Sequence, residues 1–126
     1  MLKNESNDMK IVKIENATEV ENSATSHLLE YSVALNDKDI DLAVNTIVGR
    51  YPENGYCTNK ECKELVYVLA GTGTLNKHDQ CLDFKAGDVL LIEQDEVYFW
   101  KGNCKIIMVC TPPWHKEQCK FIKEIE

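Results

Sequence analysis

The sequence predicts a single all-β domain with the architecture of a sandwich or barrel. Short runs rich in β-branched and aromatic residues recur at close spacing along most of the chain. Residues that favour turns separate these runs, and no long helical pattern alternates with them, which disfavours a parallel α/β fold. At 126 residues the chain has the size of one domain and can bury a core large enough to enclose a pocket.

The N-terminal part of the chain is expected to form a polar lead-in and then two antiparallel strands. Residues 1–24 are polar, with one short apolar hint of an edge strand. Strands are predicted over residues 27–33 and 40–50, because both are rich in apolar residues and a turn-forming Asn-Asp-Lys-Asp sequence separates them. We therefore expect a lead-in over residues 1–24 and the barrel domain over residues 25–126.

The next expected strand, over residues 62–70, has an alternating pattern that places a carboxylate among valines. Successive side chains of a strand point to opposite faces, so Glu64 shares a face with Val66 and Val68. The Gly-Thr-Gly sequence at residues 71–73 is expected to form a tight turn at the end of this strand.

The remaining sequence predicts one loop, several short strands and one helix. The loop covers residues 51–60, where a proline and an Asn-Gly pair favour turns. Further strands are predicted over residues 74–77, 80–84, 89–93, 97–101 and 104–111. The Pro-Pro pair at residues 112–113 ends the sheet, and the charge and spacing of residues 114–122 predict a short C-terminal helix.

Two segments in the middle of the chain resemble the two sequence motifs of the cupins. The first is a glutamate, Glu64, followed after six residues by Gly71. The second begins at Gly87 and continues with Asp-Val-Leu-Leu-Ile, and fifteen residues separate the two glycines. The chain therefore resembles a small single-domain cupin of the RmlC-like jelly-roll superfamily over about residues 40–112. This resemblance implies a cupin-type double-stranded β-helix, a jelly-roll barrel whose mouth forms a pocket.

The resemblance does not extend to the histidines that hold metal in this family. Metal-binding cupins use three histidines and one glutamate, and this sequence keeps only Glu64. The residues in place of the histidines are Cys57 and Asn59 (or Thr58 and Lys60, if the gap is one residue shorter) and Tyr98. No family-type metal site and no other cofactor are therefore expected. A zinc site formed by Cys57 and Glu64, with Glu61 as a further ligand, is the alternative that stays open.

Glu64 is the best candidate for a functional residue. A carboxylate inside a barrel must either be paired or take a raised pKa, and both states suit proton transfer. Tyr98 is the expected partner of Glu64 in a catalytic pair, and a structural ion pair is the alternative role of Glu64. The residues expected to bind a ligand are Arg50, Asn59, Trp100 and Cys57. Trp100 could instead belong to an aromatic core, and Arg50 could be solvated.

Composition and charge exclude several classes of partner. The chain has 14 basic and 21 acidic residues, a net charge of -7, which repels phosphate backbones and anionic lipids. We expect no nucleic acid or membrane partner. The polar opening residues predict neither a signal peptide nor an anchor, so we expect a cytoplasmic protein whose six cysteines are reduced.

Three functions of different classes are compatible with this sequence. The first is a small cupin that binds a small polar or anionic metabolite without a family-type metal. The second is an enzyme similar to the sugar-phosphate isomerases, epimerases or lyases of the superfamily, with Glu64 and Tyr98 in acid-base chemistry. The third is a structural or interaction barrel whose pocket is filled by its own side chains. A homodimer is expected by analogy with small cupins.

Overall fold

The computed structural model describes residues 9–123, and every structural statement below concerns these residues. The strands are β1 (Thr18–Ser23), β2 (Ser26–Glu30), β3 (Asp41–Tyr51), β4 (Tyr56–Asn59), β5 (Lys63–Asn76), β6 (Cys81–Lys85), β7 (Val89–Ile92), β8 (Val97–Thr111) and β9 (Cys119–Ile122). The helices are short: α1 covers Ser32–Leu35, and 3-10 helices cover Ile14–Asn16 and Lys116–Gln118. All strand pairs of the described sheet are antiparallel.

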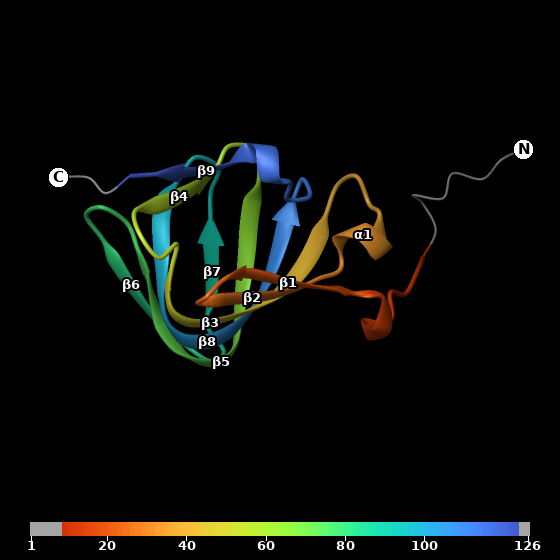
Figure 1. Cartoon of the computed structure of the whole chain (residues 1–126), viewed down its shortest axis with the longest axis horizontal. Coiled ribbons are helices and arrows are strands. Elements are labelled where there is room, and N and C mark those ends of the chain that lie inside the picture. Colours follow the sequence, from red (N-terminus) through yellow and green to blue (C-terminus); the bar gives the residue numbers. More distant parts are fainter. Residues whose placement is uncertain (1–8, 124–126) are drawn as a thin grey trace, which may run out of the picture.

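The sheet curls around its interior through three long, bent strands. The order β1-β2-β3-β8-β4-β9 forms one path, and β5 pairs with β8, β6 and β7. Figure 1 shows β3, β5 and β8 curving together around the interior, with β4 and β9 lying across the open end of the curve. This arrangement confirms the all-β, barrel-like fold that the sequence predicts.

The core occupies the concave side of this curved sheet. Ile47, Val66, Val68 and Ile106 are completely buried there. The alternation expected along β5 is confirmed, because Glu64 is buried between these strands while its sequence neighbours face outward. Glu64 is therefore an interior residue.

The predicted tight turn at residues 71–73 is wrong, because β5 continues through these residues. The pairing of β5 with β8 shifts between Val68 and Ala70, and Gly71 adopts a φ of +84°. A Cβ atom on Gly71 would clash with the Asn103 carbonyl oxygen of β8. A glycine is therefore needed at position 71, where β5 and β8 bend and approach closely. A tight turn also favours glycine, because it too requires a positive φ, so the residue type alone does not distinguish a turn from a bent strand.

The C-terminal helix expected over residues 114–122 is also wrong in extent. Only Lys116–Gln118 form a single 3-10 turn, and β9 follows it directly. β9 pairs with β4, which itself lies within the loop predicted over residues 51–60. Backbone N–H and C=O groups of β4 and β9 bond to each other, so each short strand provides hydrogen-bond partners that the other would lack on its own.

Two further differences concern the ends of predicted elements. Residues 18–23 form β1 and pair with β2, so the predicted boundary at residues 24–25 falls inside a hairpin; residues 1–8 of the predicted lead-in lie outside the described part of the chain. The strands predicted over 97–101 and 104–111 are one continuous strand, β8.

Candidate functional site

Three buried polar side chains from three strands meet at one carboxyl oxygen inside the barrel. Asn59 from β4 donates from Nδ2 to Oε1 of Glu64 on β5 at 2.6 Å. The hydroxyl of Tyr98 on β8 donates to the same oxygen at 3.3 Å, and Asn59 Nδ2 lies 3.2 Å from that hydroxyl. Each of the three residues is at most 5% exposed. The structure therefore brings together three of the residues expected from the sequence.

Gln118 from the C-terminal 3-10 turn extends this cluster towards the surface. Its Oε1 accepts hydrogen bonds from the backbone N–H groups of Glu61 and Cys62, at 3.0 and 3.3 Å. Its Nε2 donates to Oδ1 of Asn59 at 2.8 Å. Since backbone N–H groups can only donate, they fix the orientation of the Gln118 amide, which in turn fixes that of Asn59. We call Gln118 and Asn59 the amide relay. Through this relay, Asn59 presents its Nδ2–H group to Glu64.

The electrostatics of the site favour a proton on Glu64. Burial raises the pKa of Glu64, the hydrogen bonds from Asn59 and Tyr98 oppose this change, and the nearby carboxylate of Asp41 adds to it. The pKa of Tyr98 is raised well above 10, first by burial and then by Glu64. Glu64 is therefore the group in this cluster that can exchange a proton, whereas Tyr98 acts as a neutral donor.

The other predicted ligand-binding residues lie in different surroundings. Cys57 is buried opposite Tyr98, in register between β4 and β8, and burial raises the pKa of its thiol above the ordinary value. Trp100 is only 3% exposed and packs edge-to-face against Phe84 and Tyr98, so it belongs to the aromatic core. Arg50 donates hydrogen bonds to the backbone carbonyl oxygens of Glu53 and Gly55 in the loop after β3. Its guanidinium carbon Cζ lies 3.8 Å from the centre of the Phe99 ring, outside the Glu64 cluster.

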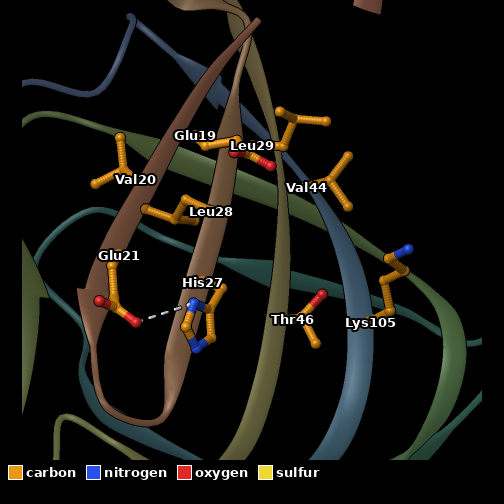
Figure 2. A pocket seen from close by; sticks show the side chains of 9 residues that line it. All are labelled: Glu19, Val20, Glu21, His27, Leu28, Leu29, Val44, Thr46 and Lys105. Atoms are coloured by element: carbon orange, nitrogen blue, oxygen red, sulfur yellow. Dashed lines mark ion pairs between the residues drawn. The ribbon is translucent and has the colours of Figure 1, made fainter.

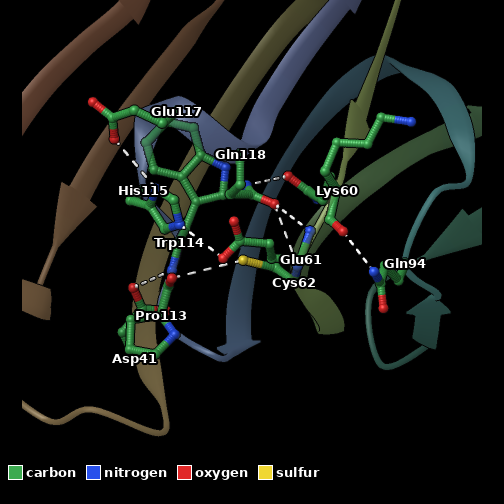
Figure 3. A network of polar contacts seen from close by, with 11 residues as sticks. Asp41, Lys60, Glu61, Cys62, Gln94, Pro113, Trp114, His115, Glu117 and Gln118 are labelled. Carbon is green, nitrogen blue, oxygen red and sulfur yellow. Dashed lines mark hydrogen bonds and ion pairs between the residues drawn. The ribbon is translucent and has the colours of Figure 1, made fainter.

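Two residues near the site were not singled out in the sequence. Gln118 lies in a segment with the charge and spacing of a surface helix, and no motif marks it as buried. Asp41 is buried at the start of β3 and accepts a hydrogen bond from the backbone N–H of Trp114 at 3.1 Å. Figure 3 shows that Asp41 and Gln118 both hold the segment after β8 against the end of the barrel.

Exposed side chains hold the outer side of the same segment. His115 lies 3.0 Å from a carboxyl oxygen of Glu61 and 3.2 Å from one of Glu117, and these two carboxylates raise its pKa (Figure 3). The backbone N–H of Lys60 also donates to the Gln118 carbonyl oxygen at 2.9 Å. The C-terminal segment therefore closes the barrel mouth directly above Asn59.

Comparisons with known proteins identify the fold. No protein-family model matches the sequence, and no curated protein matches it. Among solved structures, the nucleoside dehydratase Pac13 from Streptomyces aligns with a TM-score of 0.80 and 13% identity, over 94% of this chain and 95% of that one. A Klebsiella pneumoniae protein with a double-stranded β-helix domain aligns with a TM-score of 0.65 and 12% identity, over 93% and 100% of the two chains. A cupin-2 domain protein from Shewanella frigidimarina gives 0.51 and 19%, over 56% and 69%.

The chain has the cupin fold. This conclusion confirms the fold that the two motifs around Glu64 and Gly87 imply. At these identities the likeness shows the fold alone, so a cupin-type activity does not follow from it.

The residues in this barrel do not fit the metal site that many proteins of the cupin fold carry. Within residues 9–123, no three His, Cys, Asp or Glu side chains are grouped so that they could hold a metal ion, and this includes the zinc alternative with Cys57. In the family position, Asn59 presents an N–H group to Glu64, where a metal ligand would present a lone pair. The arrangement is a hydrogen-bonded network and not a set of metal ligands.

Two hollows lie on the outer surface of the described residues. One is a groove of about 460 Å³ beside the β1-β2 hairpin, lined among others by Leu29, Val44 and Lys105 (Figure 2). The other, of about 380 Å³, lies between β6 and β7. Neither is lined by Glu64 or Tyr98, which lie in the closed interior. Among the described helices, none has the length and hydropathy that crossing a membrane requires.

Proposed function

We propose that this cupin binds a small, neutral, polar molecule at the inner end of the barrel mouth. The observation that carries the proposal is the convergence of Asn59, Glu64 and Tyr98 on one buried carboxyl oxygen. Buried polar groups are costly unless they are paired, and an apolar side chain at any of these positions would serve the core without that cost. A ligand with a hydroxyl or amide group can exchange hydrogen bonds with the same three side chains.

The charges around the cluster favour a neutral ligand over the anionic one that the sequence left open. The buried charged side chains of the described residues are the acids Asp41 and Glu64, with no lysine or arginine among them. Arg50, the expected anion ligand, is engaged outside the barrel. An anion placed beside Glu64 would lose its hydration and gain no cation in return.

Entry of the ligand requires movement of the segment that carries Gln118. The Gln118 amide covers Asn59 from the mouth side, at 2.8 Å, and is 2% exposed. A ligand carbonyl or amide could take over these hydrogen bonds when the segment moves aside. The Pac13 structures with uridine, a neutral and polar nucleoside, support this choice of ligand class.

An acid-base enzyme is the second candidate, favoured by the raised pKa of Glu64. A carboxyl group with a raised pKa in a closed site can donate its proton to a leaving hydroxyl group as the C–O bond breaks, while the Tyr98 hydroxyl holds the substrate oxygen. The carboxylate formed in this step can take the proton from the neighbouring carbon as the C=C bond forms, which releases water and restores the carboxyl group. The neighbour Pac13 is a nucleoside dehydratase, and dehydration is a reaction of this kind. The sugar-phosphate part of the earlier hypothesis is disfavoured by the acidic surroundings.

A structural barrel is the third candidate, favoured by the burial of Tyr98 and Trp100 in the core cluster. These two aromatic side chains occupy part of the interior volume that a ligand would need. One experiment separates this candidate from the others.

The test is a binding screen by ligand-observed NMR with uridine and a panel of uncharged nucleosides, hexoses and cyclic amides. We expect a member of the panel to bind the wild type and to bind Glu64→Gln at least about tenfold more weakly, as expected for loss of the hydrogen bond that the protonated carboxyl group donates. The matched control is Glu117→Ala, an exposed carboxylate on the closing segment, which should bind as the wild type does.

Absence of binding by any neutral compound, together with unchanged melting temperatures, would favour the structural barrel. Binding that is equal in the wild type and Glu64→Gln would place the ligand elsewhere. For the enzyme candidate, mass spectrometry should detect loss of water from a bound compound in the wild type but not in Glu64→Gln. Binding without product would leave the protein a binding module.

A further inference from the structure

A second set of buried polar side chains lies on the inner wall of the barrel, apart from the Glu64 cluster. Asn45 on β3 is 3% exposed, and Ser26 on β2 is completely buried. The Ser26 hydroxyl donates to Oδ1 of Asn45 at 2.9 Å. Nδ2 of Asn22, an exposed residue on β1, donates to Oγ of Ser26 at 3.4 Å. A chain of hydrogen bonds therefore runs from the surface to Asn45 in the interior.

The strand register places the Asn45 side chain on the inner face of the sheet. Its cross-strand partner on β8 is Ile106, which is completely buried. Ile47, two residues further along β3, shares the same face and is also completely buried. An apolar side chain would fill this position without the cost of burying an amide. The core therefore gives no reason for an asparagine here.

The amide nitrogen of Asn45 has no hydrogen-bond partner among residues 9–123. Ser26 engages the oxygen end of the amide, which leaves Nδ2 with two N–H donors and no acceptor. Within the same residues, Thr58 Oγ1 is the one side-chain polar atom that is both sealed from solvent and unbonded. Nδ2 of Asn45 is therefore not sealed, and it borders space that a small molecule can reach.

The inner wall between Asn45 and Glu64 is apolar and only partly covered. Met108 of β8 packs against the core but is partly exposed, and so is its partner on β3, Ala43. Its partner on β5, Val66, is completely buried. A flat, uncharged ring can pack on such a surface while polar groups at its edges reach the side chains at either end.

The two polar ends of this wall are separated by about the length of a small metabolite. Glu64 and Asn45 flank β8, where their cross-strand partners are Cys110 and Ile106. Four residues at about 3.3 Å and two strand spacings at about 4.8 Å give roughly 16 Å between the two Cα atoms along the sheet. Because the sheet is concave and both side chains point inward, their polar atoms lie closer, on the order of 10 Å apart. A molecule of two linked rings can span this distance.

We propose that Asn45 is a specificity-determining residue of the ligand site, and that its Nδ2 donates to a ring carbonyl oxygen of a neutral cyclic amide. The hydroxyl-bearing end of the same molecule lies at the Glu64 cluster. This inference rests on the proposed function and narrows its ligand class. An amino group in place of the carbonyl would bring N–H groups face to face, because Ser26 holds the oxygen end of the amide.

The test compares the dissociation constants of uridine and cytidine, measured by NMR titration. Uridine carries a ring carbonyl oxygen where cytidine carries an amino group. The wild type should bind uridine at least about tenfold more tightly than cytidine. Asn45→Leu keeps the approximate size of the side chain but removes the donor. It should bind uridine about tenfold more weakly than the wild type does and lose the preference over cytidine.

The matched control is Thr46→Val, which changes the next residue of β3. Thr46 pairs with Lys105 and His27, both exposed, so its side chain lies on the outer face of the sheet. Thr46→Val should keep the affinity for uridine and the preference over cytidine.

A measurement without ligand separates recognition from a structural role. The double variant Ser26→Ala with Asn45→Leu removes both partners of the buried hydrogen bond. Its melting temperature should equal or exceed that of the wild type, because the wild type without ligand leaves the Asn45 N–H groups unbonded. A clearly lower melting temperature would assign Asn45 to the fold and overturn the proposal.

The remaining outcomes distinguish this inference from the proposed function. If uridine binds the wild type and Asn45→Leu equally, or if cytidine binds the wild type as tightly as uridine, Asn45 does not read a carbonyl group. If hexoses bind and both nucleosides do not, the proposed function stands and the inference is wrong, because hexoses have no ring carbonyl. Absence of binding by every neutral compound would count against both.

Discussion

Replacing Gln118 by alanine tests whether the amide relay closes the barrel mouth. The substitution leaves two buried groups without partners, the Asn59 carbonyl oxygen Oδ1 and the backbone N–H of Cys62. Each such group costs about 1–3 kcal/mol, while the Glu61 N–H is nearer to solvent and can bond to water. Water that enters the vacated space offsets part of this cost. We therefore expect a loss of about 3 kcal/mol in the free energy of unfolding.

The assay is urea unfolding followed by fluorescence, together with thermal melting. For a domain of this size, about 3 kcal/mol corresponds to a fall of roughly 10 °C in the melting temperature. Gln118→Met separates hydrogen bonding from packing, because it keeps the side-chain length but leaves the same groups unpaired. It should lose almost as much stability as Gln118→Ala.

The matched control is Glu117→Ala, which removes an exposed side chain of the same 3-10 turn whose carboxylate pairs with the exposed His115. Its unfolding curve should coincide with that of the wild type. If Gln118→Ala also coincides with the wild type, the relay does not stabilise the closed mouth and this reasoning fails. If Gln118→Met restores full stability, packing and not hydrogen bonding accounts for the effect.

Two further predictions concern the carboxylate and the bend of β5. Burial raises the pKa of Glu64 above its usual value of 4.5, so the folded state holds a proton that the unfolded chain releases, and stability falls as pH rises through the raised pKa. The stability of Glu64→Gln should not fall in this way. The free energies of unfolding of the wild type and of Glu64→Gln should therefore diverge with pH by about 1.4 kcal/mol for each unit of pKa shift. Urea unfolding measured across pH checks this, and parallel pH profiles of the two proteins would contradict it. Gly71→Ala should cost about 3 kcal/mol or more, because its Cβ would meet the Asn103 carbonyl oxygen. The control Gly87→Ala, which also has a positive φ but nothing within 4 Å of its Cβ, should cost only about 1–2 kcal/mol, and equal melting temperatures would refute the clash.

The interior position of Glu64 could be predicted because it depends on local periodicity. A period of two along β5 places Glu64 with Val66 and Val68, and the tertiary structure keeps that assignment. The approach of Asn59 and Tyr98 to Glu64 was predicted only through the family resemblance. Their meeting depends on β4, β5 and β8 coming together, which local sequence does not determine.

The wrong predictions of secondary structure, the turn at residues 71–73 and the helix over residues 114–122, have one physical origin. In both cases a contact with a distant segment decides the local structure. The glycine at position 71 has the same local chemistry in a turn and in a bent strand, and only the approach of Asn103 distinguishes the two. Residues 119–122 form a strand because β4 offers them an edge. Without that edge, the local pattern of charges favours a helix, and Gln118 looks like a solvated residue.

The position of β9 along the chain has a consequence for how the barrel is completed during protein synthesis. β5 leaves the ribosome well before β9, so the earlier strands can assemble before the segment that covers Asn59 is available. The desolvation of Glu64 is finished only when the segment with Gln118 docks on β4 and covers Asn59. Docking of that last segment therefore completes the hydrogen bonds of Asn59 and, through Asn59, the surroundings of Glu64, so the part of the chain that is made last finishes the site.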